Sequence, residues 1–294
     1  MIPLALQPFT PNLIDDARQI LGYDFMQNAV LAGTFTALAA GLVGYYVVLR
    51  NEVFTSDALG HVAFTGGLGA LLAGLQLLLG VFASTIAVAV GMGTLGGRAR
   101  GRDVAIGTIF AWVLGVGVLF LSLYTSTRSG SGGGTAGVSI LFGSILGLQQ
   151  AQAAITAAAA VITTLGLFAI ARPLLFISVD PDVAAARGVP TALVTVLFLI
   201  LLGATVAEAV QAVGALLIFG LMVTPAAIAQ RLTTRPFMGL LLSGALAIAF
   251  VWAGLALAFY VAYPASFFIT ALAFGTYLAT MIFGRVAALR GALA

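Results

Sequence analysis

The sequence contains no cysteine and no lysine, and only 7% of its 294 residues are charged. Without cysteine, the chain can form no disulfides, thiolate metal sites, iron–sulfur clusters or cysteine nucleophiles. Without lysine, it has neither a Walker A phosphate loop nor a Schiff-base lysine. If the protein depends on ATP, another polypeptide must therefore hydrolyse it.

Hydrophobic residues make up 62% of the chain, which is more than a water-soluble domain of this size keeps in solution. The composition predicts an all-α, polytopic helical membrane protein whose single transmembrane domain covers residues 1–294, with eight or nine transmembrane helices and with membrane lipid around it. The net charge of +3 comes from few groups, so it indicates topology and no nucleic-acid partner. Nine apolar segments approach the roughly 20 residues needed to cross a bilayer: 26–48, 54–75, 78–96, 104–125, 151–172, 191–208, 212–230, 237–262 and 265–284.

The arginines predict the orientation of these segments. With nine spans and the N-terminus outside, ten of the twelve arginines lie on the cytoplasmic side, and only Arg18 and Arg128 lie outside. Within an N-terminal interfacial segment, 1–24, the apolar residues after residue 12 recur at helical spacing and predict a short amphipathic helix. The Gly/Ser-rich stretch 127–137 predicts a flexible extracytoplasmic loop. The apolar stretch 140–147 is too short to span and is expected to be re-entrant or interfacial.

A polar stretch between two spans carries the start and stop signals of a short helix. Asp180 suits the N-cap, Pro181 the first helical position, and Asp182 the positive end of the helix dipole, whereas Gly188 and Pro190 form a stop. These signals predict a helix of about two turns on the arginine-rich side. Such a short helix is marginal alone, so we expect it to dock on a partner, although an ordinary capped loop fits the local signals equally well.

Two carboxylates are expected within or at the edge of a span, where a charged group marks a pathway or faces a partner. Asp57 lies four residues before His61, the only histidine, so a helix places both on one face. Carboxylate and imidazole suit Zn²⁺ or Mn²⁺, and Glu208, near a predicted span end, is a third candidate ligand. A purely structural hydrogen bond between Asp57 and His61 is the alternative, and further ligands would be needed to complete a metal site.

Several short motifs occur in a fixed order between about residue 25 and residue 285. The ordered set resembles the permease subunits of the zinc/manganese/iron ABC importer family, the ABC-3 family. In that family the first polar motif usually has a serine where this chain has Gly60 and a proline where it has Thr65. The motifs are VVLR at 47–50, SDALGH at 56–61, LFGSILG at 141–147, the stretch 180–190, AVGALL at 212–217 and TPAA at 224–227.

The resemblance implies a metal passage lined by Asp57 and His61 and a coupling helix within the cytoplasmic loop 178–190. It further implies a permease homodimer in the prokaryotic inner or plasma membrane, two cytoplasmic ATPase subunits that bind ATP, and an extracytoplasmic metal-binding protein. The transported ion would be Zn²⁺ or Mn²⁺, and no cofactor would be bound permanently. The residues that would contact the ATPase are Asp180, Pro181, Asp182, Ala184, Arg187 and Gly188.

Two other classes of protein could use the same polar groups. A secondary transporter, driven by ions or protons, could use Asp57 and His61 as a proton relay, but it would leave the short helix after Asp180 unexplained. A membrane metal hydrolase would want a His-Glu-x-x-His pair, and the chain has a single histidine. The resemblance therefore favours a transport subunit that is not itself an enzyme.

Overall fold

The computed structural model describes residues 18–94, 99–127, 133–215, 217–261 and 263–293. Within these ranges every regular element is helical, which confirms the expected all-α class. The helices are α2 (Asp24–Leu49), α3 (Val53–Leu72), α4 (Leu77–Thr94), α5 (Ala99–Thr127), α6 (Gly133–Phe142), the 3₁₀ turn η1 (Ile145–Gly147), α7 (Gln150–Val179), α8 (Pro181–Ala186), α9 (Thr191–Ala212), α10 (Ile218–Leu232), α11 (Pro236–Tyr260) and α12 (Ala265–Leu293).

Nine of these helices correspond one for one to the nine predicted segments. In the described part of the chain, seven are long and apolar enough to cross a membrane. The other two are α3, which carries Asp57 and His61, and α10, which has 15 residues. Helix α9 runs to Ala212 rather than to residue 208, so Glu208 lies inside the helix and not at its end.

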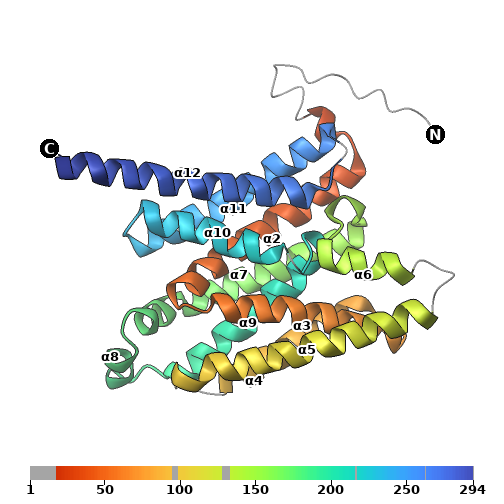
Figure 1. The fold of residues 1–294 in the computed structure, drawn as a ribbon, viewed down its shortest axis with the longest axis horizontal. Coiled ribbons are helices and arrows are strands. Elements are labelled where there is room, and N and C mark those ends of the chain that lie inside the picture. The colour runs from red at the N-terminus through yellow and green to blue at the C-terminus, as the bar shows by residue number, and fades with distance from the viewer. Residues whose placement is uncertain (1–17, 95–98, 128–132, 216, 262, 294) are drawn as a thin grey trace.

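Helix α2 forms the centre of the molecule, as Figure 1 shows: α3 to α5 lie on one side, α10 to α12 on the other, and α7 and α9 pack against it. Small residues permit this packing. A β carbon at Gly44 would overlap the carbonyl group of Met222 on α10, and Ser243 of α11 donates a hydrogen bond of 2.6 Å to the carbonyl of Gly41. The central helix therefore touches its neighbours backbone to backbone.

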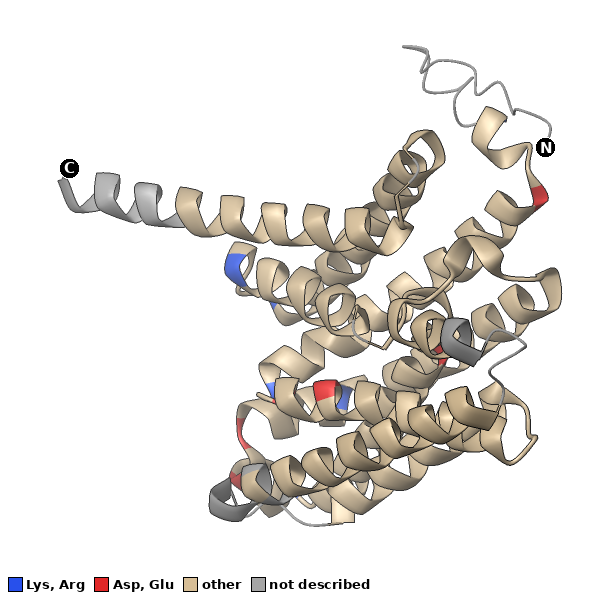
Figure 2. Cartoon of the chain, turned by 45° about the vertical axis from the view of Figure 1, so that its right-hand side comes forward, with Lys and Arg blue, Asp and Glu red and all other residues tan. Residues whose placement is uncertain are grey.

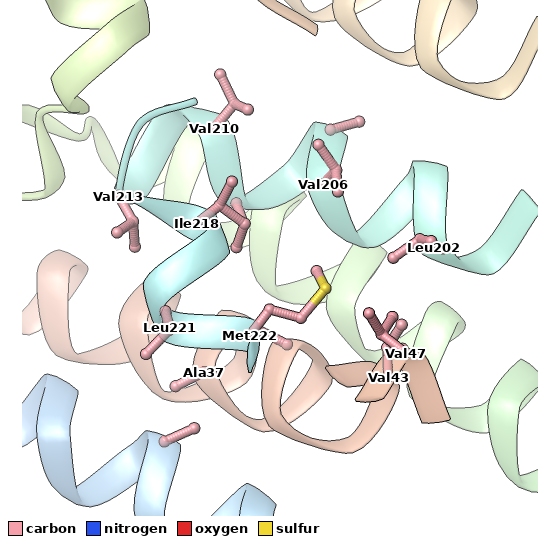
Figure 3. Close-up of a cluster of buried hydrophobic side chains, with 14 of the residues drawn as sticks. Ala37, Val43, Val47, Leu202, Val206, Val210, Val213, Ile218, Leu221 and Met222 are labelled. Atoms are coloured by element: carbon pink, nitrogen blue, oxygen red, sulfur yellow. The ribbon is translucent and has the colours of Figure 1, made fainter. Parts of the chain in front are cut away.

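One face of α9 is wholly apolar. Leu202, Val206 and Val210 recur at intervals of four residues and, with Val213, lie in a cluster shared with α2 and α10 (Figure 3). All four side chains are at most 1% exposed. Because Glu208 is two residues from Val206, it lies about 200° round the helix from this face.

The outer surface of the bundle is largely apolar, and Figure 2 shows long stretches of helix without a charged residue. A belt of exposed large hydrophobic side chains of this extent marks a membrane-facing surface. Together with the seven apolar helices it identifies a polytopic membrane protein. Its members include Trp112, Ile162, Leu165, Phe168, Leu193, Leu241, Trp252, Phe267, Phe274 and Ile282.

The connecting segments depart from expectation in one place. Residues 12–17 of the expected interfacial helix lie outside the described residues, and 18–21 are helical. Residues 128–132 of the expected loop are likewise outside, but 133–137 already belong to α6, so the loop is shorter than predicted.

The stretch 140–147 does not span: it ends α6, turns through Gly143 at φ 72°, and forms η1. It packs on the α9–α10 turn, where Ala215 N–H donates to the Ile140 carbonyl at 3.0 Å.

Candidate functional site

Asp57 and His61 lie in the first half of α3, on one face of a continuous helix, and both are partly exposed. No hydrogen bond joins the two side chains, so the structure gives no support to a purely structural pair. The imidazole of His61 meets the ring of Phe110 on α5 edge to face, with ring centroids 5.0 Å apart. The same Phe110 contacts Phe54, which is 43% exposed. The pair therefore borders an open aromatic surface rather than the core.

The two departures from the family motif leave α3 regular. Gly60 lies against the α9–α10 turn, and a β carbon there would come within 2.9 Å of the Ala215 carbonyl oxygen. A glycine thus lets the turn approach α3 next to His61. Thr65 donates a hydrogen bond of 3.0 Å to the carbonyl of Val113 on α5, which fixes the helix where the family has proline.

The third candidate ligand lies elsewhere. Glu208 is completely buried in α9, and its carboxylate lies beside the hydroxyl of Thr163 on α7. Among the described residues no three of His, Asp or Glu gather as a metal-binding group, so Glu208 does not join Asp57 and His61. The predicted span ended too early, at residue 208, whereas α9 continues to Ala212 and encloses Glu208.

The expected short helix is present as α8, six residues long. Asp180 caps it: its Oδ1 accepts hydrogen bonds from the backbone N–H groups of Asp182, at 3.1 Å, and Val183, at 2.9 Å. Gly188 ends it at φ 81°, where the left-handed region favours glycine. Ala184 is fully buried against α7 and α9. The residues around it are exposed, namely Pro181, Asp182, Val183, Ala185, Ala186, Arg187 and Gly188.

A pocket of about 430 Å³ lies beside α8, and Pro181 and the α2–α3 turn line it. In this turn, Arg50 forms an ion pair with Glu52 at 3.7 Å and donates a hydrogen bond of 3.2 Å to Thr195 of α9. Its guanidinium also stacks over Phe198, 5.5 Å from the ring centroid. The start of α3 is thus tied to α9 beside the short helix. Glu52 was missed in the sequence because a lone acid next to an arginine in a turn gives no sign of burial.

Comparison with known proteins agrees with this architecture. The sequence profile of the ABC 3 transport family matches residues 22–284. The chain belongs to the ABC 3 transport family. It is therefore a transport subunit and not an enzyme, a multi-pass protein of the plasma membrane whose ATPase is a separate chain. This membership does not favour the secondary transporter considered above.

Individual relatives cover most of the chain. It is 33% identical over 253 residues to the uncharacterized membrane protein slr2045 of Synechocystis, spanning 84% of this chain and 86% of that protein. It is 29% identical over 218 residues to the manganese transport system membrane protein MntC of Halalkalibacterium halodurans, spanning 74% and 73%. Among solved structures, PsaBC from Streptococcus pneumoniae in complex with Fab matches with a TM-score of 0.79 and 25% identity, over 92% of this chain and 95% of that one.

Proposed function

We propose that this permease imports a divalent metal ion, Mn²⁺ or Zn²⁺, through a passage lined by Asp57 and His61. The observation that carries the proposal is the pair itself: a carboxylate and an imidazole one helical turn apart and partly exposed, in a helix that is otherwise almost wholly apolar. Hard oxygen and imidazole nitrogen suit both ions. The relatives named as manganese transport proteins make Mn²⁺ the first ion to test.

One permease chain supplies only two metal ligands, Asp57 and His61. A second copy of the permease facing the first across the exposed surface beside Phe54 would contribute another aspartate and another histidine. Four ligands are what a tetrahedral zinc site uses, and a manganese site would add water. A homodimer is thus the simplest assembly that completes the passage, and Glu208, buried elsewhere, is not needed for it.

Helix α8 is the element that fits a cytoplasmic ATPase. It is anchored by Ala184, capped by Asp180, and exposed around the rest of its circumference. ATP-driven movement of the ATPase subunits would move α8, and the Arg50–Glu52 turn beside it would pass that movement to α3. An extracytoplasmic binding protein would deliver the ion, so selection can occur before the ion reaches Asp57 and His61.

The test is ATP-dependent uptake of Mn²⁺ and Zn²⁺ by proteoliposomes that contain the permease, its ATPase and its delivery protein. Asp57→Ala and His61→Ala should each abolish uptake of the transported ion while the complex still assembles and hydrolyses ATP. Asp24→Ala, which removes an exposed carboxylate at the start of α2, should transport normally. Normal uptake in both the Asp57 and His61 variants would refute the passage.

A further inference from the structure

The last part of the chain carries positive charge without negative charge. No aspartate or glutamate follows Glu208, whereas four arginines do, namely Arg231, Arg235, Arg285 and Arg290. Among the described residues, neither Arg231 nor Arg235 forms an ion pair, so the described part of the chain offers them no counter-ion. Charge asymmetry between two parts of a chain is typical of a surface that meets an external anion, such as a membrane.

Arg231 and Arg235 bracket the turn between α10 and α11, at the end of the bundle that carries α8. Gln230 donates a hydrogen bond of 3.0 Å to the carbonyl of Tyr45, near the end of α2, and the turn after α2 lines the pocket beside α8. The backbone N–H of Arg235 donates to the Thr233 hydroxyl at 3.2 Å, which fixes the turn. Both arginines are exposed, so two positive charges meet the surroundings at one turn.

An aromatic side chain of α12 holds Arg231 in place. The guanidinium carbon lies 5.3 Å from the centroid of the Tyr277 ring, and Nη2 donates a hydrogen bond of 3.4 Å to the tyrosine hydroxyl. Contact with a ring face attracts the cation without neutralising its charge. Arginine has five N–H donors in a planar fork that matches the oxygens of a phosphate group. Arg231 is therefore positioned to bind a phosphate while it stays in contact with α12.

Large apolar side chains begin directly beside these arginines. Phe237 and Met238, in the first turn of α11, and Leu241, one turn further, are each more than half exposed. Helix α11 is long and apolar enough to cross a membrane. Leu241 lies about 9 Å along it from Arg235, towards the membrane interior. Phe274 of the neighbouring α12 is exposed as well. The two charges thus lie where a lipid-facing surface ends, which is the level of phospholipid headgroups.

We propose that Arg231 and Arg235 bind the phosphate of one anionic phospholipid in each permease chain. Its acyl chains lie against Phe237, Met238 and Leu241 of α11. Two positive charges without a nearby acid favour an anionic headgroup over a zwitterionic one. Free phosphate would need the arginines alone, whereas the apolar side chains beside them accommodate acyl chains. Helices α10 to α12 lie on the other side of α2 from α3 to α5 (Figure 1), so this site is separate from the proposed metal passage.

The first experiment titrates dioleoyl phosphatidylglycerol into the delipidated permease–ATPase complex in a neutral detergent and counts bound lipids by native mass spectrometry. One site per permease chain is expected, and dioleoyl phosphatidylcholine should not fill it at the same concentrations. Arg231→Gln and Arg235→Gln should each raise the dissociation constant about fivefold, as expected for one arginine at an anionic surface. Arg172→Gln, which removes an exposed arginine of α7, should bind as the wild type does. Equal affinity in all three variants would overturn the proposal.

Two other occupants of the turn are distinguished in the same preparation. Inorganic phosphate at millimolar concentration should leave lipid binding unchanged, and displacement of the lipid would show a site for the free anion instead. The arginine variants should also retain the ATPase. If they bind phosphatidylglycerol normally but lose the ATPase, the turn contacts that subunit and the proposal is wrong.

A measurement on the wild-type chain guards against variants that fail to fold. Phosphatidylglycerol with a photoreactive diazirine in one acyl chain is crosslinked to the complex in nanodiscs, and mass spectrometry locates the adducts. Adducts should be enriched at residues 237–241 relative to Ile162 and Leu165, which are exposed on α7. The enrichment should disappear when phosphatidylcholine carries the diazirine. An even distribution, or the same enrichment with both lipids, would contradict the proposal.

Discussion

Helices α3 and α9 each carry one carboxylate inside the bundle, and the two meet opposite surroundings. Asp57 is partly exposed and has the imidazole of His61 one turn away. Glu208 is wholly enclosed, and the hydroxyl of Thr163 on α7 lies beside its carboxylate. An accessible pair can bind and release an ion, whereas an enclosed carboxylate cannot exchange one without a change in helix packing. Access to solvent therefore separates the two carboxylates.

The largest expected effect separates the two carboxylates in transport. Asp57→Asn should lower Mn²⁺ uptake by at least about tenfold, since loss of a group that only orients a metal ligand already costs about 10–100-fold. Glu208→Gln keeps Asp57 and His61 intact and should lower uptake less. Initial uptake rates in proteoliposomes, with equal amounts of assembled complex, give the comparison. Equal losses in the two variants would show that the carboxylates belong to one pathway.

The sequence alone predicted those features of the two helices that depend on neighbouring residues in the chain. Nine apolar segments gave the nine long helices, and the four-residue spacing correctly placed Asp57 and His61 on one face. The cap and stop of α8 were also local signals, so Asp180 and Gly188 were assigned correctly. Burial of Glu208 depends on α7, which is distant in sequence, and no pattern near residue 208 records it. A hydropathy pattern therefore ended α9 too early.

A smaller effect, on stability, is expected at the contact between α3 and the turn that follows α9. Gly60, next to His61, touches the Ala215 carbonyl in the turn that follows α9. Gly60→Ala should lower the free energy of unfolding by about 1–3 kcal/mol, the usual range for overpacking a tight contact. Gly115→Ala is the matched control, because this helical glycine of α5 has no atom within 4 Å of an added β carbon. It should be neutral or stabilising by up to about 1 kcal/mol.

Thermal unfolding in the same detergent compares these variants. If Gly60→Ala and Gly115→Ala shift the midpoint equally, the α9–α10 turn does not press on α3. Metal uptake by the Gly60→Ala variant tests function as well, since displacement of the turn would also move the face of α3 that carries His61. Reduced uptake with unchanged ATP hydrolysis would place the effect on the passage rather than on the ATPase.

The smallest expected effect lies at the junction of α7 and α8, where Asp180 caps the short helix. Asp180→Ala removes the acceptor for two backbone N–H groups and should destabilise α8 by about 1 kcal/mol, a typical N-cap loss. Asp180→Asn keeps an acceptor oxygen and should retain most of the stability. Because the loss is confined to a six-residue helix, we expect weaker coupling of ATP hydrolysis to uptake and little change in the overall unfolding temperature. If ATP hydrolysis is coupled to uptake equally weakly in the Ala and Asn variants, the negative charge of Asp180 matters to the ATPase, and the capping hydrogen bonds do not.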